Sequence, residues 1–312
     1  MLLGIAETRP DTEAQPIANA MRTMLDQIEA AFESGTGVVG ISTGLADLDN
    51  QLGGLRGGQL IIIAGRPAMG KTTLSMQIAH HAARNHCPTL VCSMEMPATE
   101  LAAREVARIA RLSVTDMMRG KLHDEDWAKL THGISMVNDL PMYVDEQGNL
   151  SITEVAAKTR TAKRKHGIGL LVIDYLQLMR GDGDNRNQEI ERITRGLKSM
   201  AKELNIPIIA LSQLSRKCEE RTNKRPMLSD LRESGGIEQD ADVVLFIYRD
   251  EVYDPGSQDK GTAEIIVGKQ RNGATGRIRT TFIGEYAQFA DYAGEHFAYS
   301  EPAKTKRRGM EL

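Results

Sequence analysis

The chain has 312 residues, of which 41% are hydrophobic, and its formal net charge at pH 7 is −3. This length predicts one large domain or two small ones, and the apolar content is sufficient for a core. The charge excludes a protein that attracts nucleic acid through its whole surface, so any such site must be a local patch. Three cysteines without paired spacing predict reduced thiols, and no apolar run approaches the roughly 18 residues that cross a bilayer. We expect a cytoplasmic protein without a membrane partner.

The N-terminal region predicts a polar end followed by one amphipathic helix. Residues 1–14 are polar and are expected to be a disordered segment. Residues 15–37 are predicted as a separate helical unit that ends at its glycines. The apolar stripe of this helix is covered either by its own chain or by another subunit. Its members recur at helical spacing: Ile17, Met21, Met24, Leu25, Ile28 and Phe32.

From residue 40 onward, strand-like and helix-like runs alternate, which predicts an α/β core with a mostly parallel, twisted sheet flanked by helices. After about residue 240 the helical spacing stops, and turns such as Asn272-Gly273 predict a C-terminal antiparallel hairpin. Trp127 lies in an amphipathic segment and is expected in the core. The expected strands are 59–64, 89–93, 141–144, 169–173, 207–211, 243–248, 263–267 and 277–282; the expected helices are 72–84, 99–110, 124–137, 152–166 and 187–204.

A phosphate-binding loop lies between the first expected strand and the next helix. The sequence at 65–73 fits the pattern G-x-x-x-x-G-K-[ST], with a β-branched run before it and helical spacing after it. Main-chain N–H groups and the helix N-terminus would hold a polyphosphate, Lys71 would reach the β- and γ-phosphates, and Thr72 would bind Mg²⁺. The expected nucleotide-binding residues are Gly65, Arg66, Pro67, Ala68, Met69, Gly70, Lys71, Thr72 and Thr73.

Three further strands end in a polar side chain. Asp174 follows an apolar run about 100 residues after the loop, where it is placed to hold Mg²⁺ together with Thr72. Glu95 ends another run and could activate the attacking water, although an acid near Pro97 could instead cap a helix. Gln213 could sense the γ-phosphate or could simply terminate its strand. Together with the loop, these residues predict hydrolysis of a bound nucleotide.

The ordered set of loop, Glu95, Asp174 and Gln213 resembles the RecA-like ATPase core. Longer motifs make residues 15–297 similar to the DnaB family of bacterial and phage replicative DNA helicases. These motifs are GISTGL at 40–45, GGL at 53–55, GRPAMGKTT at 65–73, SMEM at 93–96, IDYLQL at 173–178, SDLRESG at 229–235, IEQDAD at 237–242 and GKQRNG at 268–273.

This resemblance implies a homohexameric ring around single-stranded DNA, with ATP and Mg²⁺ between subunits. Lys269 and Arg271 match the residues that reach a neighbour's γ-phosphate, with Arg271 as the arginine finger. A planar, permanently charged guanidinium is suited to stabilising the transition state of phosphoryl transfer. The alternative is a basic pair on a hairpin edge that discourages aggregation.

Arg232, Glu233 and Gly235 match the family's central-channel loop that holds the DNA backbone. A glycine at 235 permits close approach of main-chain N–H groups to phosphate, and the loop has no aromatic residue for base stacking. Residues 180–186 are interpreted as a second channel loop. A basic cluster upstream is either an additional attraction for DNA or solvated surface: Arg216, Lys217, Arg221, Lys224 and Arg225.

By the same resemblance, residues 15–37 are the linker helix that packs on the adjacent subunit, and residues 38–297 form the ATPase and helicase domain. Residues 298–312 are expected to form a basic tail. The family also has a helical N-terminal domain that helps recruit primase. The resemblance also implies a helicase loader as partner. Only about 14 residues precede the helix here, so primase contact stays open.

Two functions remain open at this point. The first is a motor that hydrolyses ATP, moves along single-stranded DNA and unwinds duplex, with 5′ to 3′ polarity implied by the resemblance. The second is a nucleotide-dependent DNA-binding ring or scaffold that does not unwind. Glu95 and Arg271 favour the motor, because a scaffold needs neither a water-activating base nor a finger.

Overall fold

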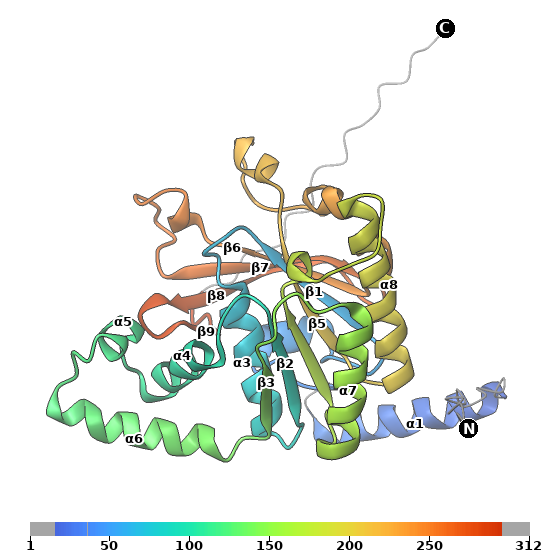
Figure 1. The fold of residues 1–312 in the computed structure, drawn as a ribbon, viewed down its shortest axis with the longest axis horizontal. Helices are drawn as coiled ribbons and strands as arrows, with labels where there is room; N and C mark the ends of the chain where they lie inside the picture. Colours follow the sequence, from blue (N-terminus) through green and yellow to red (C-terminus); the bar gives the residue numbers. More distant parts are fainter. Residues whose placement is uncertain (1–15, 36, 295–312) are drawn as a thin grey trace, which may run out of the picture.

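The computed structural model describes residues 16–35 and 37–294, and its centre is one nine-stranded sheet in the order β3-β2-β4-β5-β1-β6-β7-β8-β9 (Figure 1). The strands from β3 to β6 in this order are parallel, and the last three pairings are antiparallel. The predicted parallel sheet with antiparallel C-terminal strands is therefore confirmed. The strands are β1 (Leu60–Gly65), β2 (Thr89–Ser93), β3 (Met142–Asp145), β4 (Leu170–Asp174), β5 (Ile208–Gln213), β6 (Val243–Tyr248), β7 (Thr262–Gln270), β8 (Gly276–Ile283) and β9 (Gln288–Asp291).

The helices occupy the predicted gaps, and the five helices expected after residue 40 are confirmed to within one residue at either end. Helix α1 covers 17–34 of the helical unit expected at 15–37. Strand β9 and helices α2, α5 and α9 were not predicted, because each is too short to show a periodic pattern. Residues 1–14 and 298–312 lie outside the described part. The helices are α1 (Ile17–Ser34), α2 (Ala46–Leu52), α3 (Lys71–Arg84), α4 (Ala98–Ala110), α5 (Val114–Met118), α6 (Asp124–Asn138), α7 (Ile152–His166), α8 (Arg186–Leu204) and α9 (Gly235–Asp240), with 3₁₀ turns η1 (Leu176–Leu178), η2 (Arg216–Glu220), η3 (Leu228–Ser234), η4 (Asp250–Val252) and η5 (Gly284–Tyr286).

The sheet is buried on both faces, so its central strands are uninterrupted apolar runs. Ile61 and Ile63 of β1 belong to the core that contains α3, whereas Leu60 and Ile62 belong to the core that contains α7 and α8. All six residues of β1 are buried. This two-sided core fixes the position of the strand that leads into the phosphate-binding loop.

The register of the parallel strands brings the predicted site residues to one edge of the sheet. Gly65 at the end of β1 pairs with Gln213 at the end of β5, and Ser93 at the end of β2 pairs with Asp174 at the end of β4. Parallel strands share a carboxyl edge, which is where open α/β sheets bind ligands. The side chains that follow these strands are therefore close neighbours.

Helix α1 extends along the base of the molecule and carries its apolar stripe on the surface (Figure 1). Ile17 is 76% exposed and Phe32 is 86% exposed. A stripe of this kind at helical spacing requires a covering partner if it is to leave water. The other members are also exposed: Met21, Met24, Leu25 and Ile28.

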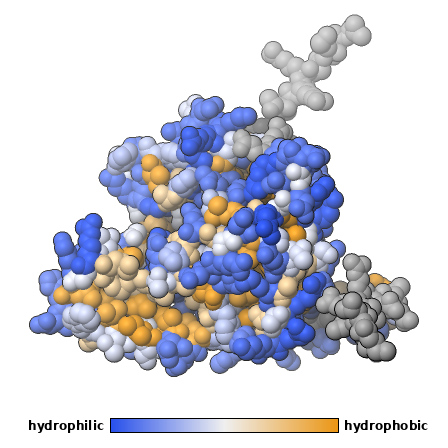
Figure 2. Space-filling model, in the orientation of Figure 1, coloured by the Kyte–Doolittle hydropathy of each residue, from blue (hydrophilic) through white to orange (hydrophobic). Residues whose placement is uncertain are grey.

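A second apolar surface lies on the α5 and α6 extension, where Figure 2 shows a hydrophobic patch at the lower left. Trp127 of α6 is 57% exposed, so the prediction that it lies in the core is wrong. The reason is that α6 packs on α4 and not on the sheet: a Cβ added at Gly133 would lie 3.1 Å from the Ala110 Cβ. Nearby Met118, Ile134 and Met136 are exposed as well.

All three cysteines are free thiols, as predicted. Cys92 and Cys218 are buried, and burial raises the pKa of Cys92 to about 12. These thiols are therefore protonated side chains of the core. Within the described ranges, no helix is both long enough and apolar enough to span a membrane.

Candidate nucleotide site

The phosphate-binding loop spans the gap between β1 and α3. Strand β1 ends at Gly65 and α3 begins at Lys71. Gly70 has φ +101°, and an added Cβ would lie 3.1 Å from the Phe289 ring and 3.3 Å from the Phe282 ring. Glycine is therefore required at Gly70 by both conformation and space. The loop and the N-terminus of α3 form the main-chain cradle that suits an anionic phosphate.

A cavity of about 510 Å³ lies beside this loop. Lys71, Thr72 and Glu95 all line it, although Glu95 comes from the end of another strand. Gln213 and Met96 line it as well. The residues predicted for phosphate binding, metal binding and water activation therefore meet at one cavity; the loop contributes Pro67, Ala68, Gly70, Lys71, Thr72 and Thr73.

Two predicted loop residues direct their side chains elsewhere. Met69 is 1% exposed and belongs to the core on the α3 face. The Arg66 side chain lines a different cavity and makes an ion pair described below. These residues can contribute only main-chain groups to a nucleotide, which is compatible with a loop that binds phosphate through its N–H groups.

Lys71 is held inside the loop by main-chain carbonyls. Its Nζ donates to the Gly65 oxygen at 3.1 Å and to the Arg66 oxygen at 3.3 Å. Burial lowers the pKa of Lys71, and the carboxylates of Asp174 and Glu95 partly offset this effect. In the described part of the chain no carboxylate makes an ion pair with Lys71, which favours exchange of its carbonyl contacts for phosphate oxygens.

Thr72 and Asp174 form the predicted metal pair. Thr72 Oγ1 donates to Asp174 Oδ2 at 2.7 Å, across 102 residues of sequence. The other carboxylate oxygen, Asp174 Oδ1, is buried and has no hydrogen-bond partner among the described residues. Burial raises the pKa of Asp174, while the hydrogen bond from Thr72 lowers it. A buried carboxylate oxygen without a donor, next to a hydroxyl, fits the ligand preference of Mg²⁺.

Glu95 is exposed at the end of β2 and faces the cavity. The alternative that it caps helix α4 has no support in the hydrogen bonds of that helix. The N-cap position is Pro97, and the free N–H of Ala98 donates to Glu146 Oε2 at 2.6 Å. Because another acid satisfies the helix terminus, Glu95 is available to bind a water molecule in the cavity.

Gln177 of η1 holds the main chain at Gln213. The main-chain N–H of Gln213 donates to Gln177 Oε1 at 3.2 Å, and Gln177 Nε2 donates to the Gln213 oxygen at 3.2 Å and to Ser212 Oγ at 3.0 Å. The Gln213 side chain lines both the nucleotide cavity and a neighbouring cavity of about 620 Å³. It therefore lies between the phosphate-binding loop and the segments beyond the sheet edge.

Several cavity residues were missed by sequence reasoning. Arg249 follows β6 directly; its Nη1 donates to the Ala68 oxygen at 3.0 Å, and its guanidinium carbon lies 3.8 Å from the Phe282 ring centre. The strand-end rule that identified Asp174 and Glu95 could also have identified Arg249, because β6 ends at the same edge. The others depend on long-range contacts that leave no local signal: Arg104, Tyr175, Phe282, Gly284 and Ala287.

Lys269 and Arg271 lie near the amino-terminal ends of the parallel strands, whereas the phosphate-binding loop lies at their carboxyl-terminal ends. Gln270 at the end of β7 pairs with Val243 at the start of β6, whereas Ala64 of β1 pairs with Phe246 near the end of β6. A strand of six residues spans about 20 Å, so neither basic side chain reaches the cavity of its own chain.

The side chains of Lys269 and Arg271 are held by contacts within their own chain. Lys269 Nζ donates to the oxygens of Glu238 at 2.6 Å and Ala241 at 2.7 Å. Arg271 Nε lies 3.4 Å from Asp242 Oδ1, and its side chain is 50% exposed. Strand β7 lies inside the sheet, whose edge strands are β3 and β9, but its pairing with β8 covers only 262–267, so the interpretation of Lys269 and Arg271 as an anti-aggregation pair stays an alternative.

The residues predicted to bind DNA lie where η3 meets α9. Arg232 and Glu233 are in η3, and Gly235 begins α9. The side chains of 232–235 lie outside the part that the structure describes. Leu231, Arg186 and Lys217 line the 620 Å³ cavity, which therefore separates this junction from the second predicted channel loop at 180–186.

Three of the five residues of the basic cluster before this junction make contacts within the chain: two are in ion pairs, and one lies over an aromatic ring. Arg221 makes a bidentate contact with Asp230, at 2.8 and 2.7 Å, and Arg225 binds the buried Glu264. Lys224 lies 4.8 Å from the centre of the Tyr253 ring. These three side chains stabilise the segment. The solvated-surface alternative does not describe Arg221 and Arg225, and the additional attraction for DNA stays a prediction.

The matches to known proteins agree with this geometry. The DnaB-like helicase C terminal domain matches residues 40–291. The chain is 45% identical over 302 residues to the replicative DNA helicase DnaB of Pasteurella multocida, covering 94% of this chain and 65% of that protein. It is 40% identical over 294 residues to the replicative DNA helicase DnaC of Bacillus subtilis, covering 93% and 65%. The chain thus spans slightly less than two thirds of these relatives.

Solved structures show the same fold. "ATPase Domain of G40P" matches with a TM-score of 0.85 and 36% identity over 90% of this chain and 100% of that one. "The Structure Of A DnaB-Like Replicative Helicase And Its Interactions With Primase" matches with a TM-score of 0.82 and 36% identity over 90% of this chain and 68% of that one. The RecA-like architecture predicted from the sequence is confirmed, and the chain belongs to the DnaB-like helicase C-terminal domain family.

Proposed function

We propose that this chain is the ATP-hydrolysing motor of a ring-shaped replicative DNA helicase that moves on single-stranded DNA and separates duplex. The observation that carries the proposal is that the predicted catalytic residues lie at two opposite ends of the parallel strands. Lys71, Thr72 and Glu95 meet at one cavity, whereas Arg271 lies about 20 Å away at the opposite edge. A complete site therefore needs two subunits.

Within one subunit, the described residues divide the chemistry of hydrolysis. The phosphate-binding loop and Lys71 hold the polyphosphate, and Glu95 orients or deprotonates the attacking water. Thr72 and Asp174 would hold Mg²⁺, which supplies positive charge to the phosphate oxygens when bound. Gln213 contacts the γ-phosphate or the water and links the site to the next cavity.

The neighbouring subunit supplies Arg271 as the finger, with Lys269 beside it. Among the described residues, the half-exposed Arg271 guanidinium contacts one carboxylate, at 3.4 Å, and one main-chain carbonyl, at 3.4 Å. It can exchange these two long contacts for a phosphate at modest cost in free energy. Provision of the finger in trans makes turnover depend on assembly. This arrangement suits a homohexameric ring in which each nucleotide is bound between two subunits.

The exposed stripe of α1 is the second element of assembly. Phe32 and Ile17 are exposed in one chain, and the apolar surface around Trp127 on α5 and α6 offers a complementary covering. We propose that α1 packs on the α5 and α6 surface of the adjacent subunit. The alternative, in which the stripe folds back on its own chain, would require α1 to leave the position that it occupies.

Arg232, Glu233 and Gly235 are proposed to hold the backbone of single-stranded DNA in the ring's channel. Phosphate contacts from Arg and from main-chain N–H groups carry no sequence information, which suits a motor that must move along any sequence. The chain would act inside the cell, with a helicase loader as partner. The relative solved with primase makes primase a further candidate, tested by direct binding to this chain.

The experiment compares ATP turnover, with and without an oligothymidylate, and unwinding of a forked duplex, with Lys71→Ala as the control. We expect DNA-stimulated turnover and strand separation that both disappear in the control. Turnover without unwinding would refute the motor and favour the nucleotide-dependent scaffold. Absence of turnover in the unmodified chain would refute both the assignment of Glu95 and the proposal.

A further inference from the structure

Arg66 of the phosphate-binding loop is directed away from the nucleotide cavity. Its side chain is only 9% exposed and lines the 620 Å³ cavity together with Arg216, Lys217 and Leu231. This cavity borders segment 215–235, which carries the proposed DNA-binding residues at its end. A charged side chain of the loop therefore extends toward the proposed DNA-binding side of the molecule.

The partner of Arg66 is Glu219 of η2. Arg66 Nε donates to Glu219 Oε1 at 3.0 Å, and Nη2 donates to Oε2 at 3.3 Å, which is the bidentate arrangement. Arg66 Nη1 also donates to the Leu214 oxygen at 2.8 Å, and the Tyr253 hydroxyl lies 3.4 Å from Glu219 Oε1. The hydrogen bond from Arg66 lowers the pKa of Glu219, so the carboxylate is ionised at neutral pH.

Further contacts within segment 215–235 connect Glu219 to the region before Arg232. Two residues after Glu219, Arg221 binds both carboxylate oxygens of Asp230. Asp230 Oδ2 also accepts the Met227 N–H at 2.9 Å. Asp230 lies two residues before Arg232, so two bidentate ion pairs and a short run of chain connect the phosphate-binding loop to the proposed DNA contact.

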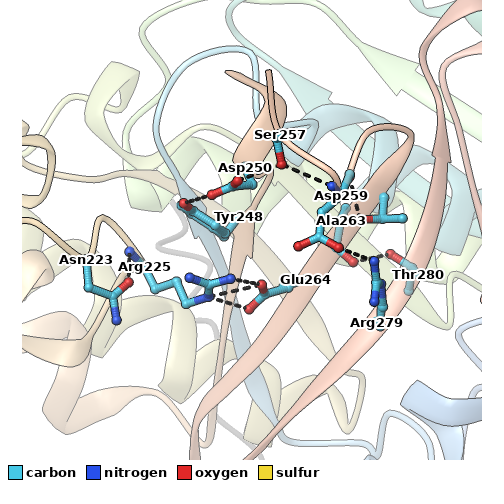
Figure 3. A network of polar contacts seen from close by, with 11 residues as sticks. Asn223, Arg225, Tyr248, Asp250, Ser257, Asp259, Ala263, Glu264, Arg279 and Thr280 are labelled. Carbon is cyan, nitrogen blue, oxygen red and sulfur yellow. Dashed lines mark hydrogen bonds and ion pairs between the residues drawn. The ribbon is translucent and has the colours of Figure 1, made fainter. Parts of the chain in front are cut away.

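A third ion pair limits the ways in which the segment can move. Arg225 binds the buried Glu264 of β7 and lies 4.8 Å from the Tyr248 ring centre (Figure 3). This contact fixes the middle of the segment to the sheet. The ion pair between Arg221 and Asp230 joins the two parts of the segment on either side of this fixed point.

The nucleotide side of this connection begins at Lys71. Its Nζ donates to the main-chain oxygen of Arg66 at 3.3 Å. A phosphate that draws the ammonium group away from this oxygen changes the hydrogen bonding of the residue that holds Glu219. We propose that Glu219 is a positioning residue that, through its ion pair with Arg66, couples the state of the phosphate-binding loop to the grip of segment 215–235 on DNA.

This inference rests on the proposed function, because it requires both ATP turnover and DNA binding. The test compares Glu219→Gln with Glu220→Gln in the full 312-residue chain. The control removes the same charge at the adjacent residue, for which no ion pair is found in the part of the chain that the structure describes. The readouts are basal turnover, KM for ATP, stimulation by an oligothymidylate and melting temperature.

We expect Glu219→Gln to keep the basal rate and KM while the stimulation by DNA falls about tenfold, a typical size for coupling between two sites. Glu220→Gln should keep the stimulation of the unmodified chain. In an Arg66→Gln background, Glu219→Gln should cause no further fall, because the ion pair is already absent. The nucleotide dependence of oligothymidylate affinity should weaken in parallel with the stimulation.

Four results would overturn the inference. These are full stimulation in Glu219→Gln, an equal fall of basal and stimulated rates with a lower melting temperature, an equal loss in Glu220→Gln, or additive effects with Arg66→Gln. If the unmodified chain hydrolyses ATP without stimulation by DNA, the proposed function fails first, and the coupling role fails with it.

Discussion

Replacing Ile28 and Phe32 of α1 with alanine tests whether the exposed stripe joins subunits. Full burial of a large apolar side chain stabilises by about 3 kcal/mol. Phe32 is 86% exposed and Ile28 is 54% exposed in one chain. Replacing them should therefore weaken the free energy of association by about 2.5 and 1.5 kcal/mol, respectively. A total of about 4 kcal/mol weakens association roughly a thousandfold.

The same change should leave the isolated fold intact, because neither side chain is buried in one chain. We expect the free energy of unfolding of the monomer to change by less than about 0.5 kcal/mol. The matched control is Asp26→Ala with Glu33→Ala, which alters two exposed residues of the same helix away from the stripe. Both variants keep the helix-forming tendency of α1.

Sedimentation velocity or native mass spectrometry with Mg²⁺ and ATP measures the assembly. The stripe variant should be mainly dissociated at concentrations where the control and the unmodified chain form rings. An assembly as stable as the unmodified one would refute the proposal that α1 joins subunits. A lower melting temperature of the monomer would instead show that the stripe packs within its own chain.

Four other substitutions test individual residues. Glu95→Gln should lower ATP turnover about 10²-fold or more with nucleotide affinity kept, and normal turnover would exclude a base role. Arg271→Ala should abolish turnover while nucleotide affinity stays nearly unchanged, and full activity would disprove the finger in trans. Arg232→Ala should weaken binding to all single-stranded sequences evenly and lower the salt slope by about 1, whereas a sequence-selective loss would contradict a phosphate contact. Arg225→Ala leaves the buried Glu264 without its cation and should cost about 3 kcal/mol in urea denaturation; a cost below about 1 kcal/mol would show that the pair is not needed for stability.

The sequence by itself determined the local structure and the chemistry of the phosphate-binding loop. The spacing of apolar residues depends only on neighbours within a few positions, so this spacing located β1 and α3. It also located the polar residues that follow the neighbouring strands. Glu95 and Asp174 were accessible to this reasoning because parallel strands share one carboxyl edge. Arg249 could have been found in the same way, since it follows β6.

Only the tertiary structure decided which distant residues meet and which remain apart. Trp127 is exposed because α6 packs on α4, and Arg221 and Arg225 are engaged with Asp230 and Glu264. Strand order and register determine these contacts, and local periodicity does not encode them. The same strand order places Arg271 at the end of the sheet opposite the phosphate-binding loop, and no local pattern in the sequence encodes that separation.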